Sequence, residues 1–232
     1  MRNILLNIQL FYLTKTVQKV TESEAIVKIS GSDTGAAVIS LATDLLPYSP
    51  SVAGAGTVTI GTGATSIVGV GTSFATASHV NAKIYNSSGT YVGTITSVTD
   101  TTHATLSANG AVAIAGTTYN ISYATQVVNG TPTVNIIGFQ WAGEPGAIYK
   151  INRNSVRVAS LLADNGNFMD FVELFPSEPT QNTSDISVNI LTAAAAAVQG
   201  EVWIRLRKID GYVSKIETAQ FGTYDNTLVQ GS

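Results

Sequence analysis

The chain has no cysteine among its 232 residues, and this absence excludes two kinds of stabilising device. Disulfide bonds cannot form without cysteine, and metal sites built on thiolate ligands are excluded as well. The stability of the fold must therefore come from a packed core. Hydrophobic residues make up 44% of the sequence, which is enough to bury such a core and argues against disorder.

Charged side chains are also scarce. Asp, Glu, Lys and Arg make up 12% of the sequence, half of the ~25% that is usual in globular proteins. The net charge of −3 provides no electrostatic footprint for nucleic acid or for an anionic membrane surface, so neither partner is expected. A surface so poor in charge must be covered by Ser, Thr, Asn and Gly, or by a protein partner.

Residues that could carry catalysis are few. The two histidines, His79 and His103, belong to no motif with a carboxylate or a second histidine, so both are interpreted as solvated strand or turn residues. No G-x-S-x-G elbow presents a nucleophile, and no glycine-rich motif opens a phosphate-binding helix. A glycosidase needs two carboxylates across a cleft, but Asp170 and Glu173 would fall on opposite faces of a strand. We therefore expect no enzyme activity, no catalytic residue, no metal and no cofactor.

The N-terminus is apolar but too short for a membrane span. Residues 4–13 read ILLNIQLFYL, where ~20 apolar residues are needed to cross a bilayer. Asn7 and Gln9 interrupt the run and no small-residue cleavage site follows, which argues against a signal peptide. Residues 4–20 fit either one face of a helix or a strand, with an extended form favoured. We expect residues 1–20 to be an N-terminal arm or a first strand, with Phe11 and Tyr12 as candidate contact residues.

Strand patterns dominate the second half of the chain. In residues 185–191 and 201–209 apolar and polar residues alternate with a period of two, which predicts antiparallel strands with one face in a core. Asp164-Asn165-Gly166 stands between two apolar runs and predicts a hairpin. Nothing along the chain has the pattern of a long amphipathic helix. The expected fold is all-β, an antiparallel β-sandwich.

Residues 53–125 differ in composition from both flanks. Lys83 and Asp100 are the only charged residues between Ser51 and Thr131, where Gly, Ala, Ser, Thr, Val and Ile prevail. Short β-branched runs separated by Gly or Asn turns predict a small all-β unit. We expect a second domain at residues 53–125, inserted into a sandwich made of residues 21–52 and 126–232. Its expected strands are residues 57–60, 66–70, 80–85, 91–98, 104–107 and 117–123.

Aromatic residues in the flanks are candidate interaction residues. Trp141, Tyr149 and Trp203, together with Tyr212, could stack on sugar rings. Burial or subunit contact is the other interpretation, because Trp and Tyr are enriched in interfaces. The sequence leaves the two interpretations open.

Two parts of the chain resemble phage proteins. The middle part has the turn VGVGTSF (residues 68–74), the strand end ITSVTD (residues 95–100) and TLSAN (residues 105–109), and it resembles a small β module that recurs in virion proteins of tailed phages. The flanks contain VTESEAIVKISGSDTGAAVISLATDLL, IIGFQWAGEPGAIYKINRNSVRVASLL and VWIRLRKIDGY. They are similar to virion structural proteins of large cyanophages and related marine myoviruses.

The resemblance implies a non-enzymatic structural protein located in the virion. A decoration or cement protein on the outside of the capsid is the favoured role. A neck, tail or fibre component and a host-glycan-binding module are the alternatives. The expected partners are the major capsid protein or other virion proteins, and further copies of this chain. A homo-oligomer is expected, with a trimer favoured by analogy with phage decoration proteins.

Overall fold

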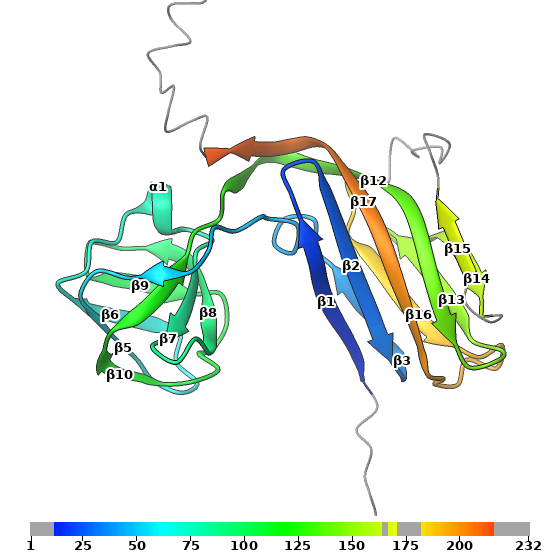
Figure 1. Cartoon of the computed structure of the whole chain (residues 1–232), viewed down its shortest axis with the longest axis horizontal. Helices are drawn as coiled ribbons and strands as arrows, with labels where there is room; N and C mark the ends of the chain where they lie inside the picture. Colours follow the sequence, from blue (N-terminus) through cyan, green and yellow to red (C-terminus); the bar gives the residue numbers. More distant parts are fainter. Residues whose placement is uncertain (1–11, 164–166, 171–181, 216–232) are drawn as a thin grey trace, which may run out of the picture. The chain divides into compact units, whose positions relative to one another are not determined.

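The computed structural model describes residues 12–163, 167–170 and 182–215, and nearly all of its regular structure is β-strand (Figure 1). The chain divides into two compact units. The sandwich unit comprises residues 12–45 and Val128–Tyr212. The insert unit comprises Leu46–Val127 together with residues 213–215. Each unit has its own hydrophobic core.

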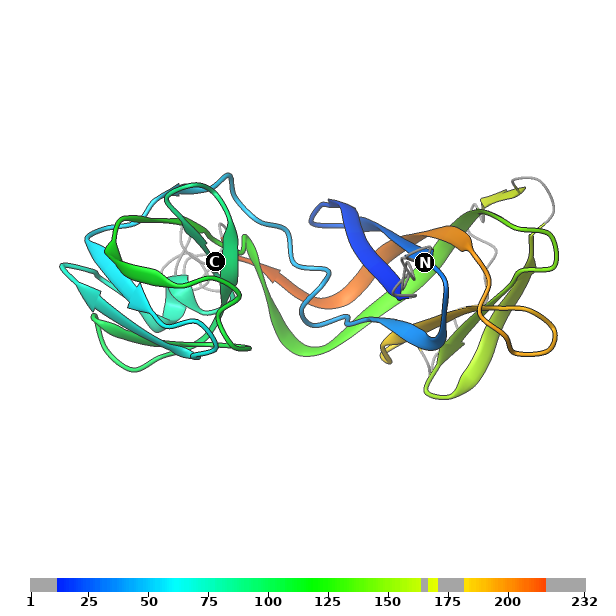
Figure 2. The same ribbon diagram turned by 90° about the horizontal axis from the view of Figure 1, so that it is seen from below.

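Two antiparallel sheets form the sandwich unit (Figures 1 and 2). The five-stranded sheet has, in order, β1 (Leu13–Val20), β2 (Glu24–Gly31), β17 (Gly200–Ser214), β12 (Gln126–Gly143) and β15 (Asn167–Asp170). The four-stranded sheet has β14 (Val156–Leu162), β13 (Ile148–Arg153), β16 (Ile186–Leu191) and β3 (Asp33–Ile39).

The core of the sandwich unit lies between these two sheets. Side chains of a strand alternate between its two faces, so every second residue is buried. Val202, Ile204 and Leu206 of β17 are buried, and β16 buries Ile186, Val188 and Ile190 in the same way. The alternation predicted for residues 185–191 and 201–209 is confirmed, and with it the all-β sandwich.

The insert unit contains one eight-stranded sheet. Ile114 and Ile121, from strands far apart in this sheet, belong to one core cluster, so the sheet curls around its buried face. One helical turn, α1 (Thr76–His79), lies beside it. The strands are, in sheet order, β10 (Ile114–Thr117), β5 (Thr57–Ile60), β6 (Ser66–Val70), β9 (His103–Leu106), β8 (Tyr91–Val98), β7 (Lys83–Asn86), β11 (Tyr119–Ser122) and β4 (Val52–Ala53).

The borders of the insert unit differ from those expected. The sequence placed them at residues 53 and 125, whereas the structure places them at Leu46 and Val127. Residues 213–215 were assigned to the sandwich, and this assignment is wrong. The Lys215 backbone N–H donates to the Thr125 carbonyl at 2.8 Å, and its ammonium group donates to the Ser78 and Val80 carbonyls at 3.3 Å each.

Residues 13–20 form strand β1. This strand pairs with β2 so that Leu13 lies opposite Gly31 and Val20 opposite Ala25. Leu13 and Val20 also pack against the sandwich core. For these residues the first-strand alternative therefore holds, and a detached arm does not. Residues 1–11, Phe11 included, lie outside the described residues.

The predicted hairpin at residues 164–166 is wrong. Those three residues lie outside the described part of the chain, but the strands on either side of them do not pair. β14 lies at an edge of the four-stranded sheet, and β15 pairs with β12 in the five-stranded sheet. An Asn-Gly sequence favours a local turn, but it does not determine the sheet that the next strand joins.

Candidate functional site

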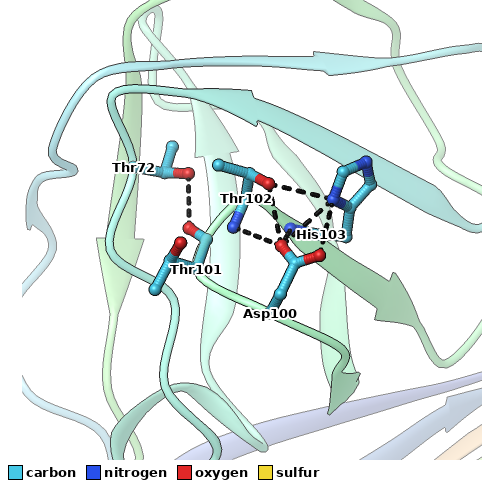
Figure 3. Close-up of polar contacts among 5 residues, drawn as sticks. All are labelled: Thr72, Asp100, Thr101, Thr102 and His103. Carbon is cyan, nitrogen blue, oxygen red and sulfur yellow. Dashed lines mark hydrogen bonds and ion pairs between the residues drawn. The ribbon is translucent and has the colours of Figure 1, made fainter.

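A polar cluster occupies the turn between β8 and β9 (Figure 3). The ring nitrogen Nδ1 of His103 lies 3.0 Å from each carboxylate oxygen of Asp100. The expectation that His103 has no carboxylate nearby is therefore wrong. Asp100 stands three residues earlier, and the tight turn brings the two side chains together.

The Asp100 carboxylate is held by the turn that it starts. One of its oxygens accepts hydrogen bonds from the Thr102 hydroxyl at 2.8 Å, the Thr102 N–H at 2.7 Å and the His103 N–H at 2.8 Å. These bonds stabilise the ionised form, with those from Thr102 contributing most, so the pKa of Asp100 lies far below its usual value. Asp and Asn are common in turns for this kind of local bonding.

The VGVGTSF segment braces the same turn. The Thr72 hydroxyl donates to the Thr101 carbonyl at 2.8 Å (Figure 3), and the Phe74 N–H donates to the same carbonyl at 3.0 Å. Glycine is required at residue 56, where the chain passes close to Val70 of this segment. Gly56 has φ +71°, and a Cβ atom there would lie 2.2 Å from the Val70 carbonyl oxygen. The motif that carries the resemblance therefore has a structural role in the insert unit.

The geometry does not match a nucleophilic triad. A triad needs one ring nitrogen of histidine facing the carboxylate and the other facing the hydroxyl. Here the Thr102 hydroxyl lies 2.9 Å from Nδ1 of His103, the same nitrogen that faces Asp100. Within the described residues, no three His, Cys, Asp or Glu side chains gather in a way that could hold a metal ion.

His79 is buried, which corrects its interpretation as a solvated residue. It is 8% exposed, and its ring lies edge-on to Phe74 and Tyr123, with centroids 5.4 and 5.3 Å away. Its Nδ1 accepts a hydrogen bond from the Ala75 N–H at 3.1 Å. Burial lowers the pKa of His79, because the charged imidazolium is poorly solvated there.

Trp141 and Tyr149 are core residues, which contradicts their role as contact residues. The Trp141 indole N–H donates to the Leu162 carbonyl at 2.7 Å, and the Tyr149 hydroxyl donates to the Ala142 carbonyl. Trp141 is 6% exposed and Tyr149 is fully buried. Both rings lie between the two sheets, so neither can stack on a sugar. Tyr12, by contrast, is exposed.

Trp203 is the candidate that does face outward. It lies on β17 directly opposite Lys28 of β2, whose ammonium nitrogen is 4.6 Å from the centre of the indole. Lys28 also forms a 2.6 Å ion pair with Glu201. Trp203 and Arg205 line a hollow of about 340 Å³ on the outer face of the five-stranded sheet.

The alternation of residues 201–209 puts Trp203 and Arg205 on one face, but the sequence did not reveal the other lining residues. Gln18, Ile26 and Gln140 come from β1, β2 and β12, which are distant in the sequence. The period-two pattern assigns each of these residues a face within its own strand. It does not reveal which strands become neighbours, so no signal in the sequence could have assembled the hollow.

Comparison with known proteins gives no relative to argue from. No protein-family model, curated protein or solved structure matches the chain. In the described part of the chain, no helix is long and apolar enough to span a membrane. The helix α1 has four residues. The function is therefore proposed from the sequence and from the geometry above.

Proposed function

We propose that the protein is a non-enzymatic structural protein of a tailed-phage virion, which decorates the outside of the capsid. The resemblance of both chain parts to virion proteins supports this proposal. The single observation that carries it is the nearly uncharged exterior of the insert unit.

The insert unit exposes apolar and hydroxyl side chains in place of charges. Lys83 and Asp100 are the only charged residues in Leu46–Val127. Solvent-facing surfaces of small domains usually carry ~25–35% charged residues. In the insert unit, by contrast, apolar and aromatic side chains are exposed: Val70 is 73% exposed, and Val68 and Tyr91 are also exposed. Such a surface is typical of one that another protein covers.

The edges of the eight-stranded sheet support the same conclusion. β10 and β4 are its edge strands, and neither contains a charged residue. Exposed edges attract the strands of other chains, and soluble proteins commonly keep them very short, as β4 with two residues and β10 with four are, or block them with Lys or Pro, which β4 and β10 lack. In the sandwich unit, the edge strand β1 carries Lys15 and Lys19 in this way. We therefore assign contact between copies to the insert unit and attachment to the capsid to the sandwich unit.

Immunogold labelling of phage particles that encode the chain tests the location. The expected result is gold distributed over the heads. Gold confined to necks or tails would replace the decoration role by the neck, tail or fibre alternative. Particles that carry no label, and no peptide of the protein by mass spectrometry, would overturn the virion proposal.

Truncation tests how the protein attaches. We expect that deleting residues 1–11 abolishes incorporation into particles while the remaining chain stays folded, because β1 begins only at Leu13. Normal incorporation of the truncated protein would contradict a role for the N-terminal segment in contacts with a neighbour.

Light scattering tests the expected oligomer. Burial of exposed apolar surface between copies favours a closed homo-oligomer, and we expect a trimer. A monodisperse monomer at micromolar concentration would contradict assembly in solution.

A further inference from the structure

The hollow on the outer face of the five-stranded sheet has the features of a small ligand site. Its volume of about 340 Å³ lies at the lower end of the range for such sites, ~300–1,000 Å³. Four neighbouring strands contribute to it. The lining residues are Gln18, Ile26, Gly138, Phe139, Gln140, Trp203 and Arg205.

The hollow arises from a change of phase in β12. Val134 and Ile136 of β12 point into the core before the change, and Phe139 and Trp141 point into the core after it. Residues 136–139 are all buried, so the alternation changes from even to odd numbers there, and Gln140 is exposed on the outer face beside Gly138. Glycine has no side chain, so space remains at Gly138 where a larger residue would fill the hollow.

The ring of Trp203 is held before any ligand arrives. Lys28 lies opposite it on β2, with its ammonium nitrogen 4.6 Å from the ring centre, and Glu201 fixes Lys28 through the 2.6 Å ion pair. A ring fixed in this way loses little conformational freedom when it binds a ligand. Trp203 is half-buried, so part of the indole faces the hollow.

The two cations nearest to Trp203 are each paired with an anion. Lys28 pairs with Glu201, and the Arg205 guanidinium lies 3.2 Å from the Glu24 carboxylate. These two cations therefore offer little free positive charge to an acidic ligand in the hollow, while Arg207 lies further along the same face of β17, opposite Glu24. The uncharged polar groups are the exposed amides of Gln18 and Gln140, which both donate and accept hydrogen bonds.

We propose that this hollow binds a neutral saccharide. The apolar face of a sugar ring stacks on the Trp203 indole, which offers a broad flat surface with little rotamer freedom to lose. Gln18 and Gln140 then bind sugar hydroxyl groups and fix the orientation of the ring. The volume suits one or two sugar rings of a longer glycan. This binding activity goes beyond the proposed structural role and does not depend on it.

The full-length protein is tested on an array of neutral and acidic oligosaccharides. The strongest neutral binder is then titrated while tryptophan fluorescence is recorded. The chain has two tryptophans, and Trp141 is buried, so the signal change reports on Trp203. We expect Trp203→Ala to weaken binding at least about tenfold and Gln140→Ala to weaken it by about threefold. Because Trp203→Ala removes the fluorescent reporter, its binding is read on the array.

Two further variants separate stacking from folding. Trp203→Phe keeps an aromatic ring, and its affinity is expected between those of the wild type and Trp203→Ala. Tyr91→Ala removes an exposed aromatic ring from the insert unit and is expected to leave binding unchanged. If Trp203→Ala does not fold, as judged by circular dichroism, Gln18→Ala and Gln140→Ala decide the question.

Three results would overturn the proposal. The first is that no neutral glycan binds above background, and the second is that only acidic glycans or nucleic acids bind. The third is that binding to a neutral glycan is as strong in the folded Trp203 and Gln140 variants as in the wild type.

Discussion

The two units of this chain reach stability by different means. The sandwich unit buries large rings, among them Trp141, Phe139 and Tyr149, and carries ion pairs such as Lys28–Glu201 on its outer face. The insert unit buries mainly Val, Ile and Ala, and its surface is almost free of charge. The sandwich unit therefore carries paired charges where the insert unit carries almost none. Exposed apolar residues occur on both units, for example Leu162 on the sandwich unit and Val70 on the insert unit.

Truncation of one large ring in each core tests whether the two cores are independent. Trp141→Ala should destabilise the sandwich unit by about 3–5 kcal/mol, because it leaves a cavity and removes the indole hydrogen bond. Phe74→Ala should have an effect of about the same size on the insert unit, where Phe74 is 2% exposed. Scanning calorimetry measures both.

Each variant should lower one thermal transition and leave the other in place. Tyr91→Ala serves as the control with a smaller expected effect, since it removes a ring that is 44% exposed and packs edge-on against Tyr85. A single transition that both core variants lower equally would contradict two separate cores.

Excision of the insert unit is the second test, and its expected effect on the sandwich unit is smaller. Leu46–Val127 is replaced by a short Gly-Ser join. The remaining chain should fold with the circular dichroism of a β-protein, because the sandwich core contains no residue of the excised segment. A product that is unfolded at room temperature would show that the sandwich unit depends on the insert.

The all-β class and many individual strands could be predicted from the sequence. The expected strands at residues 57–60, 66–70 and 91–98 coincide with β5, β6 and β8, because turn glycines and β-branched runs are local signals. The short helix α1 and strand β10 were missed. Four residues are too few for helical periodicity to appear, and β10 reads IAGT, with a glycine inside the strand.

Long-range pairing is what the sequence did not reveal. The turn signal at residues 164–166 favoured a hairpin, yet β14 and β15 belong to different sheets. The same limit applies to the aromatic residues. The alternation of residues 201–209 places Trp203 on the polar face, but the sequence FQWAGEPG around Trp141 has no such alternation, and Trp141 faces the core. The change of phase in β12 turns Trp141 toward the core, and the composition of the sequence does not reveal this change.

Acid should affect the insert unit through His79. Burial lowers the pKa of this histidine in the folded state below its ordinary value of 6.5. The unfolded chain therefore takes up a proton near pH 6.5 while the folded chain does not, so stability falls as the pH drops through 6.5. The loss levels off below the folded-state pKa.

The measurement is the melting temperature of the insert unit between about pH 7.5 and pH 5. His79→Phe keeps a ring between Phe74 and Tyr123 and should flatten this dependence. An equally steep decline in His79→Phe would assign the effect to other groups.

The smallest expected effect compares one turn from each unit. Asp100 accepts three hydrogen bonds from Thr102 and His103, whereas Asp33, in the sandwich unit, accepts one from the Gly35 N–H at 3.0 Å. At neutral pH, Asp100→Ala should therefore lower the melting temperature of the insert unit more than Asp33→Ala lowers that of the sandwich unit. Because the pKa of Asp100 is lowered in the folded state, its contribution is complete above the ordinary value of 3.8 and declines as the pH falls below it. The difference between the wild type and Asp100→Ala should accordingly shrink in strong acid. Equal effects of the two substitutions at neutral pH would mean that the bracing of this turn by Thr72, and not its carboxylate, holds it in place.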